Sequence, residues 1–310
     1  MTIPPAVRSA ALRLGTRGSA LAQAQAQVVA AALRAATRRP VELVTISTAG
    51  DRSGRQISEL GGTGVFVAGV RDALLAGEVD LAVHSYKDLP TAPAPGLVIA
   101  AVPTRADGRD AVVSRHGRLG ELPAGSRVGT GAARRIALLK SMRRPVEVVP
   151  IRGNVTTRID AVDGGRIDAV VVALAGLQRL GAESRAAEIL DPREFTPAPA
   201  QGALAVECRA DDEPVIAALA DLDDPVARAT VTAERALLRV LEAGCTAPVG
   251  AVAGVDGDRL QLLGMVAAAD GTAVLRRHHD GPLSRSDEVG EQLAAVLLAA
   301  GATDLLGSSA

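Results

Sequence analysis

Short apolar runs alternate with longer segments of helical periodicity along the first two-thirds of the chain. This alternation predicts an α/β fold with largely parallel sheets. The predicted strands are 11–15, 41–47, 79–84 and 97–102 in a first lobe, and 110–114, 127–130, 146–151 and 168–173 in a second. The predicted helices between them are 19–37, 64–76, 132–143 and 153–163.

Three strand-centred segments occur twice, in the same order. The pairs are 13–16 with 127–130, 41–46 with 146–151, and 77–83 with 165–171. Two similar α/β lobes normally face each other across a cleft, and ligand sites favour such clefts. We therefore expect chemistry in the loops that end the repeated strands. Pro-containing segments 102–104 and 197–199 are the best hinge candidates between the lobes.

The pattern changes after about residue 222. Asp224 followed by Pro225 is a good helix start, because an N-cap carboxylate precedes a proline at the first helical position. The helix is expected to run to about residue 243. Three strand-like runs follow at 249–254, 259–268 and 272–280, and then a helix at 286–300. Strands closed by a helix predict a small α+β third domain.

Composition narrows the class of protein. The chain has 310 residues, enough for two or three domains, and only 1% aromatic residues with a net charge of -1. Nucleic-acid binding is not expected, because aromatic side chains for stacking on bases are scarce and no global field attracts polyanions. We find no apolar signal core and no uncharged run of membrane-spanning length. Cys208 and Cys245 give no disulfide framework and no metal spacing, so a reduced, cytoplasmic protein without a metal or a membrane partner is expected.

Two repeated strand-to-helix turns, 15–19 and 129–133, place small residues where backbone N–H groups at a helix start are unpaired. Such turns bind carboxylates or phosphates. Arg17, Arg134 and Arg135 add positive charge beside them. Plain helix capping with solvated arginines is the alternative, and the two copies make the interpretations about equal.

Two further loops follow repeated strands. The segment 83–90 brings His84, Lys87 and Asp88 together just past a predicted strand, where open α/β sheets bind ligands. An ionised Asp88 among cations would stabilise a positively charged intermediate; the alternative is an exposed loop with a weak ion pair. The segment 150–158 carries Arg152 and Arg158 around Gly153, which lets the backbone approach a ligand closely. A capped helix start with solvated arginines is its alternative.

Cys245 follows the predicted helix end in a Gly- and Pro-bracketed loop. The negative end of a helix dipole raises a thiol pKa, which is the reverse of what activates a turnover nucleophile. A lone loop cysteine is most often inert, and this one suits a permanent covalent anchor better than a hydrolase nucleophile. Cys208, in an apolar run, is most simply a core thiol.

Taken together, these segments resemble the porphobilinogen deaminase (hydroxymethylbilane synthase) family. The matching pieces, in the family's order, are 16–22, 61–66, 83–90, 128–130 with Arg134 and Arg135, 152–155, 201–203 and 244–248. No single piece is decisive, but the ordered set spans nearly the whole chain and is highly specific.

The resemblance implies two lobes like those of two-lobed (type II) periplasmic binding proteins, plus a small C-terminal α+β domain. Domain 1 would comprise 8–103 and 201–220, domain 2 would comprise 104–200, and domain 3 would comprise 221–310. The family condenses four porphobilinogen molecules head to tail on a dipyrromethane primer, releases ammonia, and hydrolyses off a linear tetrapyrrole. A monomer is expected.

The resemblance also assigns residues. Cys245 would hold the dipyrromethane through a thioether, and Asp88 would be the catalytic carboxylate that stabilises the cationic azafulvene formed when ammonia leaves. The remaining cofactor positions are Lys87, Asp88, Thr130, Arg134, Arg135 and Gly153. The substrate positions are Arg17, Ser19, Phe66, Arg152, Arg158 and Gln201.

Two departures from the family pattern affect single contacts. Gly131 and Ala132 stand where hydroxyl residues are common, and Thr63 replaces a frequent lysine. Two other functions remain open: a two-lobed protein that binds or senses a small anion without catalysis, and a Cys/His hydrolase that uses Cys245 and His84. The first has no need of a third domain with Cys245, and the second lacks a local nucleophile signature.

Overall fold

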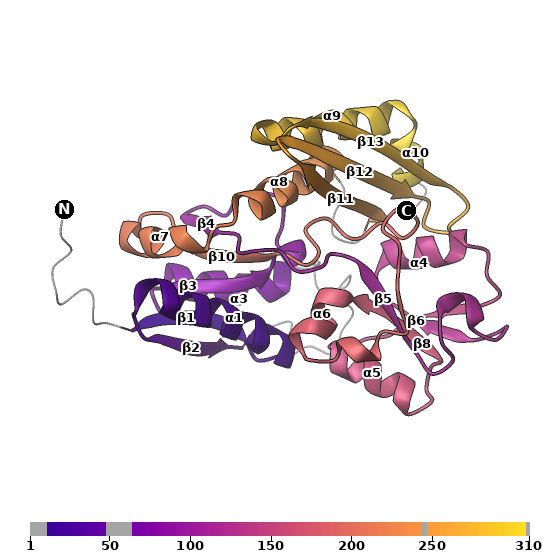
Figure 1. The fold of residues 1–310 in the computed structure, drawn as a ribbon, viewed down its shortest axis with the longest axis horizontal. Coiled ribbons are helices and arrows are strands. Elements are labelled where there is room, and N and C mark those ends of the chain that lie inside the picture. Colours follow the sequence, from indigo (N-terminus) through magenta and orange to yellow (C-terminus); the bar gives the residue numbers. More distant parts are fainter. Residues whose placement is uncertain (1–10, 48–63, 243–246, 308–310) are drawn as a thin grey trace. The chain divides into compact units, whose positions relative to one another are not determined.

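The computed structural model describes residues 11–47, 64–242 and 247–307, which fold into two compact units (Figure 1). One unit comprises Met1–Arg105 and Ala203–Arg228, and the other comprises Ala106–Gly202 and Ala229–Ala310. We call them unit 1 and unit 2. The first two changes of unit fall close to the Pro-containing segments 102–104 and 197–199. The third falls within the helix that begins at Pro225.

Unit 1 is built on a five-stranded sheet. Its strands, in spatial order, are β2 (Val41–Ile46), β1 (Leu12–Arg17), β3 (Leu81–Ser85), β10 (Leu204–Arg209) and β4 (Leu97–Ala101). β1 is parallel to β2 and β3, whereas β10 is antiparallel to β3 and β4. Four strands therefore share one direction, and β10 alone is reversed.

Helices cover both faces of this sheet. α1 (Ala20–Thr37) and α7 (Glu213–Leu219) pack on one face, and α3 (Gly64–Leu75) packs on the other. Because successive side chains of a strand point to opposite faces, Leu81 and Val83 of β3 enter the core with α1, while Ala82 enters the core with α3. A strand buried on both sides reads as a continuous apolar run.

Unit 2 contains a second five-stranded sheet with an equivalent pattern. Its strands, in spatial order, are β7 (Glu147–Val149), β6 (Arg127–Gly129), β8 (Ala169–Ala173), β5 (Asp110–Ser114) and β9 (Glu188–Ile189). Again only one strand, β5, is reversed. α4 (Ala133–Ser141) and α5 (Val155–Asp163) pack on opposite faces, and α6 (Leu174–Arg179) follows β8 directly.

The duplication seen in the sequence therefore extends to the topology. Strands β1, β2 and β3 match β6, β7 and β8, as the three repeated segments predict. The structure adds two more pairs, β10 with β5 and β4 with β9. Each reversed strand is the first strand after the chain enters its unit, at residue 106 for β5 and at residue 203 for β10.

A third, antiparallel sheet of β11 (Val249–Asp256), β12 (Arg259–Ala267) and β13 (Val274–Pro282) forms the rest of unit 2. Side chains of α8 (Pro225–Val240), α9 (Ser286–Ala299) and α10 (Ala302–Gly307) form a core with it. The predicted start of α8 is confirmed, because the Asp224 carboxylate accepts hydrogen bonds from the backbone N–H groups of Val226 and Ala227. The predicted α+β fold of this segment is also confirmed.

The sequence reasoning missed several short elements. They are β9, β10, α6, α7 and α10. β10 is buried along most of its length and lacks the alternation that marks a strand with one exposed face. α6 has six residues, too few to show a helical period.

Candidate active site

The loop that carries Asp88 is fixed at both of its ends. β3 ends at Ser85, and Tyr86–Asp88 form one 3₁₀ turn. The Tyr86 N–H donates to the carbonyl of Ala203 at 3.1 Å, and the Leu89 N–H donates to the carbonyl of Tyr86 at 3.2 Å. The Leu89 side chain is buried in a small cluster that includes Val67. Asp88 itself is half-buried, and no residue that the structure describes makes a hydrogen bond or an ion pair with its carboxylate.

A buried ionic group lies beside this loop in unit 1. The Glu207 carboxylate of β10 accepts hydrogen bonds from Arg71 of α3 at 2.8 and 3.0 Å, and it lies 3.3 Å from Nε2 of His84 in β3. Burial alone would raise the pKa of Glu207, but the contacts with His84 and Arg71 outweigh burial and hold that pKa below its ordinary value. The group joins three elements one residue before β3 ends.

The first of the two turns expected to bind an anion follows β1. Ser19 is the N-cap of α1, and its Oγ accepts a hydrogen bond from the Ala22 N–H at 3.3 Å. Arg17 ends β1 and is half-buried. Because β1 and β3 are parallel neighbours, their carboxyl ends lie at one edge of the sheet. Arg17 and Ser19 therefore share that edge with Lys87 and Asp88.

The equivalent edge of unit 2 carries two turns, one after β6 and one after β7. Thr130 follows β6, is fully buried, and accepts a hydrogen bond through Oγ1 from the Ala132 N–H at 3.3 Å. Arg152 and Gly153 follow β7, and Asn154 caps α5 by accepting from the Thr157 N–H at 2.9 Å. Gly153 has φ +96, and a Cβ at that position would lie 2.8 Å from Cγ2 of Thr157. Only glycine fits this turn without strain.

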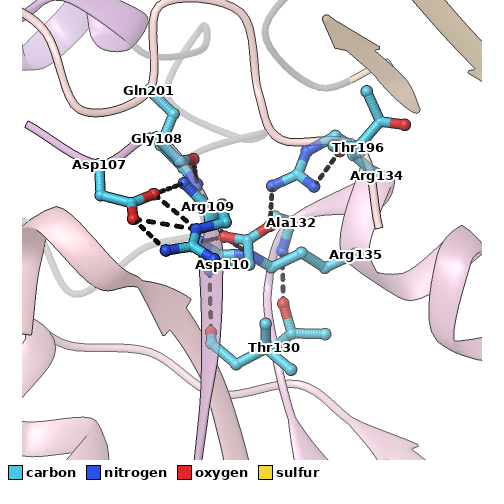
Figure 2. Close-up of polar contacts among 11 residues, drawn as sticks. Asp107, Gly108, Arg109, Asp110, Thr130, Ala132, Arg134, Arg135, Thr196 and Gln201 are labelled. Carbon is cyan, nitrogen blue, oxygen red and sulfur yellow. Dashed lines mark hydrogen bonds and ion pairs between the residues drawn. The ribbon is translucent and has the colours of Figure 1, made fainter. Parts of the chain in front are cut away.

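Figure 2 shows a cluster in unit 2 in which Arg134 and Arg135 contact the fully buried carboxylate of Asp110, at the start of β5. Arg134 donates to Oδ2 of Asp110 at 2.8 Å, and Arg135 donates to Oδ1 at 2.7 and 3.2 Å. Gln201 donates to Oδ1 at 2.9 Å and to the carbonyl of Gly108 at 2.8 Å, which uses both hydrogens of its amide. The structure thus joins three predicted site residues through a carboxylate that the sequence reasoning missed.

This cluster carries more positive than negative charge. Burial would raise the pKa of Asp110, but the charges of Arg134 and Arg135 hold it well below its ordinary value. Burial lowers the pKa of Arg158, and the charge of Arg135 lowers it further. Arg158 donates through Nε to the carbonyl of Gly153 at 2.9 Å. The single carboxylate of Asp110 thus faces two arginines, with a third nearby, and a bound anion would offset the excess charge.

Arg179 is a further cation that the sequence reasoning missed. It is the last residue of α6, which follows β8, the counterpart of the strand that precedes Asp88. Its Nη2 donates to the carbonyl of Gly202 at 2.6 Å, and burial lowers its pKa to about 10. The sequence does show an arginine shortly after a repeated strand. It was missed because α6, with six residues, is too short to be recognised as a helix.

Some predicted residues cannot be placed. Cys245 and Thr63 lie outside the described residues, and Phe66 belongs to α3 with its side chain outside them. Gly131 is exposed, and Ala132 caps α4 without a side-chain hydrogen bond.

Among the residues that the structure describes, no group of three or more His, Cys, Asp or Glu side chains is arranged to hold a metal ion. None of the helices described has both the length and the apolar character that crossing a bilayer requires.

Comparison with known proteins identifies the family. The family model described as "Porphobilinogen deaminase, dipyromethane cofactor binding domain" matches residues 12–217, and the model of the C-terminal domain of porphobilinogen deaminase matches residues 228–299. Porphobilinogen deaminase 1 of Streptomyces coelicolor is 54% identical over 97% of this chain and 98% of its own length. Porphobilinogen deaminase of Nocardia farcinica is 54% identical over 95% of this chain and 88% of its own length.

Among solved structures, a putative methionine-binding lipoprotein of Bacillus subtilis has a TM-score of 0.42 and 14% identity, over 68% of this chain and 89% of its own. The two family models together cover most of the chain, and the relatives match it almost from end to end. The chain therefore belongs to the porphobilinogen deaminase family.

Proposed function

We propose that the chain condenses four porphobilinogen molecules head to tail on a dipyrromethane primer, releases ammonia at each addition, and then releases hydroxymethylbilane. Membership of the family makes it a transferase of tetrapyrrole biosynthesis with a dipyrromethane cofactor-binding domain. The observation that carries the proposal is the cluster around Asp110, which gathers cations at the carboxyl edge of a duplicated sheet. The alternative, a non-catalytic protein that binds a small anion, is not favoured by this family.

The arginines of unit 2 suit a dipyrromethane, which carries two carboxylates on each pyrrole. Asp110 offsets only part of the charge of Arg134 and Arg135, and Arg158 adds to the excess. We assign cofactor binding to Lys87, Asp88, Thr130, Arg134, Arg135 and Gly153. We assign the thioether to Cys245. When bound, the dipyrromethane supplies the pyrrole carbon that the first substrate joins.

The remaining predicted site residues are assigned to the substrate. They are Arg17, Ser19, Phe66, Arg152, Arg158 and Gln201. We add Arg179, because it ends the helix that follows β8 and its guanidinium is held by the carbonyl of Gly202 at 2.6 Å. A charge-assisted hydrogen bond between a guanidinium and a carboxylate is stronger than a neutral one. Acetate and propionate side chains of the substrate supply those carboxylates.

Asp88 has the catalytic role in this proposal. Its carboxylate accepts the pyrrole N–H of the bound substrate and stabilises the positive charge that develops on that pyrrole as ammonia leaves. The backbone hydrogen bonds of Tyr86 and Leu89 fix the turn that holds Asp88. The carboxylate therefore needs little movement to stabilise the charge that develops in the transition state. The absence of a paired cation among the described residues leaves the carboxylate available to the substrate.

The experiment that tests the function is a coupled assay on the purified protein. Incubation with porphobilinogen is expected to release one ammonia for each substrate consumed and to yield a linear tetrapyrrole. Binding of porphobilinogen without release of ammonia would support the anion-binding alternative instead.

We also propose three domains, 8–103 with 201–220, 104–200, and 221–310, in a monomer that acts in the cytoplasm. The family's biosynthetic role and the buried free thiol of Cys208 support a reducing compartment. Light scattering after size-exclusion chromatography tests the monomer, with a mass near 31.5 kDa expected.

A further inference from the structure

Arg134 and Arg135 are consecutive residues of one helix, so their side chains would normally point in different directions and not toward one ligand. Successive side chains of an α-helix leave its axis about 100° apart, since one turn takes 3.6 residues. Their guanidiniums nevertheless meet at one carboxylate, Arg134 at Oδ2 of Asp110 and Arg135 at Oδ1. Asp110 is therefore the group that draws the two side chains together.

Each guanidinium is also held at a second point by a backbone carbonyl. Arg134 donates through Nη1 to the carbonyl of Thr196 at 2.6 Å, and Arg135 donates through Nη1 to the carbonyl of Val171 at 2.9 Å. Two fixed acceptors define the plane of each guanidinium. Both side chains are about 95% buried, so solvent cannot provide the same restraint.

The contacts do not exhaust the donors. A guanidinium has five N–H groups. Asp110 and the carbonyl of Thr196 take two from Arg134, and Asp110 and the carbonyl of Val171 take three from Arg135, within the part of the chain that the structure describes. N–H groups remain on both guanidiniums, and the same contacts fix the positions of these guanidiniums. The pair also keeps a net positive charge after Asp110 is counted.

We propose that Asp110 is a positioning residue that orients Arg134 and Arg135 for binding the carboxylates of the pyrrole ligand. The inference rests on the proposed function and deepens it, because Asp110 touches the arginines and not the ligand. Gln201, near the end of segment 106–202 of unit 2, donates to Oδ1 of the same carboxylate and to the carbonyl of Gly108. These two hydrogen bonds help to hold the Asp110 carboxylate in place. A purely structural ion pair would affect folding alone.

The test compares Asp110→Asn with the wild type through four readouts. These are the thermal unfolding midpoint, the fraction of protein whose intact mass carries a two-pyrrole adduct after incubation with porphobilinogen, and KM and kcat measured separately. We expect Asp110→Asn to load at most a tenth as much cofactor in a fixed time, and its loaded fraction to show a KM at least tenfold higher. Normal loading and normal KM with a lowered unfolding midpoint would overturn the proposal.

Asp168→Asn is the matched control. Asp168 also pairs with an arginine, Arg115, but it precedes β8 at the opposite edge of the sheet from the arginine cluster. Its loss is expected to leave loading and KM unchanged. A drop in loading as large as that of Asp110→Asn would show that any lost ion pair in this sheet has the same effect, which overturns a specific positioning role.

A double variant covers the case in which Asp110→Asn fails to fold. Asp110→Asn with Arg134→Gln keeps the net charge of the wild-type cluster, and Arg134→Gln alone is its reference. We expect the double variant to load several-fold less cofactor than the reference, because Arg135 has lost its anchor. Equal loading would overturn the proposal. If the proposed function itself is wrong, the wild type will carry no adduct and show no turnover, which no Asp110 result can mimic.

Discussion

Arg71 of α3 holds the buried carboxylate of Glu207 in β10 with three hydrogen bonds, of which the shorter two are Nη2 to Oε1 at 2.8 Å and Nε to Oε2 at 3.0 Å. The Glu207 side chain is only 2% exposed. Removing one member of a buried ion pair is strongly destabilising, because the other charge remains buried. This contact ties the strand beside Asp88 to the helix on one face of the sheet.

Glu207→Gln should therefore lower the free energy of unfolding at pH 7 by roughly 3 kcal/mol. The pKa of Glu207 is lowered in the folded protein, so its contribution is complete above the unfolded pKa of about 4.3 and is lost as the pH falls through the folded pKa. The difference between variant and wild type should shrink below pH 4 in denaturant titrations. Glu78→Gln, at an exposed position, is the control. A difference that stays constant down to pH 3 contradicts the account.

Asp88→Asn should fold normally and lose turnover. Losing one electrostatic stabiliser of a transition state typically costs about 10²–10³-fold in kcat. The unfolding midpoint should change little, because no described residue makes a hydrogen bond or an ion pair with the carboxylate. KM should change less than kcat, since the asparagine oxygen can still accept the pyrrole N–H. Steady-state kinetics on protein already loaded with cofactor measures this. The control is Asp72→Asn, at an exposed position of α3, which should behave as the wild type. Near-normal turnover of Asp88→Asn would show that Asp88 has no catalytic role.

Arg158→Gln should weaken substrate binding more than catalysis. One charge-assisted hydrogen bond contributes about 1.5–3 kcal/mol, which corresponds to a rise in KM of at least about tenfold. The rise of KM with ionic strength should become shallower in the variant, since one cation is missing. Arg185→Gln is the control, because Arg185 pairs with Asp163 at the surface. A kcat effect without a KM effect would argue against a binding role.

Gly153→Ala should destabilise the protein and disturb the Arg152 loop. A non-glycine residue in a sparsely populated backbone region costs about 1–3 kcal/mol, and here the Cβ also meets Thr157. Gly181→Ala is matched, since Gly181 has φ +66 but no atom within 4 Å of a Cβ. Gly153→Ala should lose more stability than Gly181→Ala, and this difference measures the clash between the new Cβ and Thr157. Its KM should also rise. Equal losses and unchanged KM values would show that the turn does not position Arg152.

The sequence was sufficient for most of the architecture, because the repeated segments kept their order and their apolar character. It also predicted that Asp88 lies just past the end of a strand, and the structure places it in the turn after β3. β10 was not recognised as a strand because its residues are buried along most of its length, and α6 was too short for a period. Arg179 was missed with α6.

Asp110 could not be predicted for a different reason. Its role depends on partners 24, 25 and 91 residues away, and only the fold brings these together. In the sequence, Asp110 is the first residue of the predicted strand 110–114, and no neighbouring residue indicates its partners. The same holds for Glu207, whose partner Arg71 is 136 residues away.

The intact mass of the purified protein tests the central claim most directly. The chain has two cysteines, and burial raises the pKa of the Cys208 thiol to about 11, so Cys208 serves as the matched control. We predict a two-pyrrole adduct on the wild type and on Cys208→Ala, and no adduct on Cys245→Ala. Further single-pyrrole increments are expected when porphobilinogen is added to the wild type. An active wild-type protein with an unmodified mass, or an adduct that persists in Cys245→Ala, would contradict the claim.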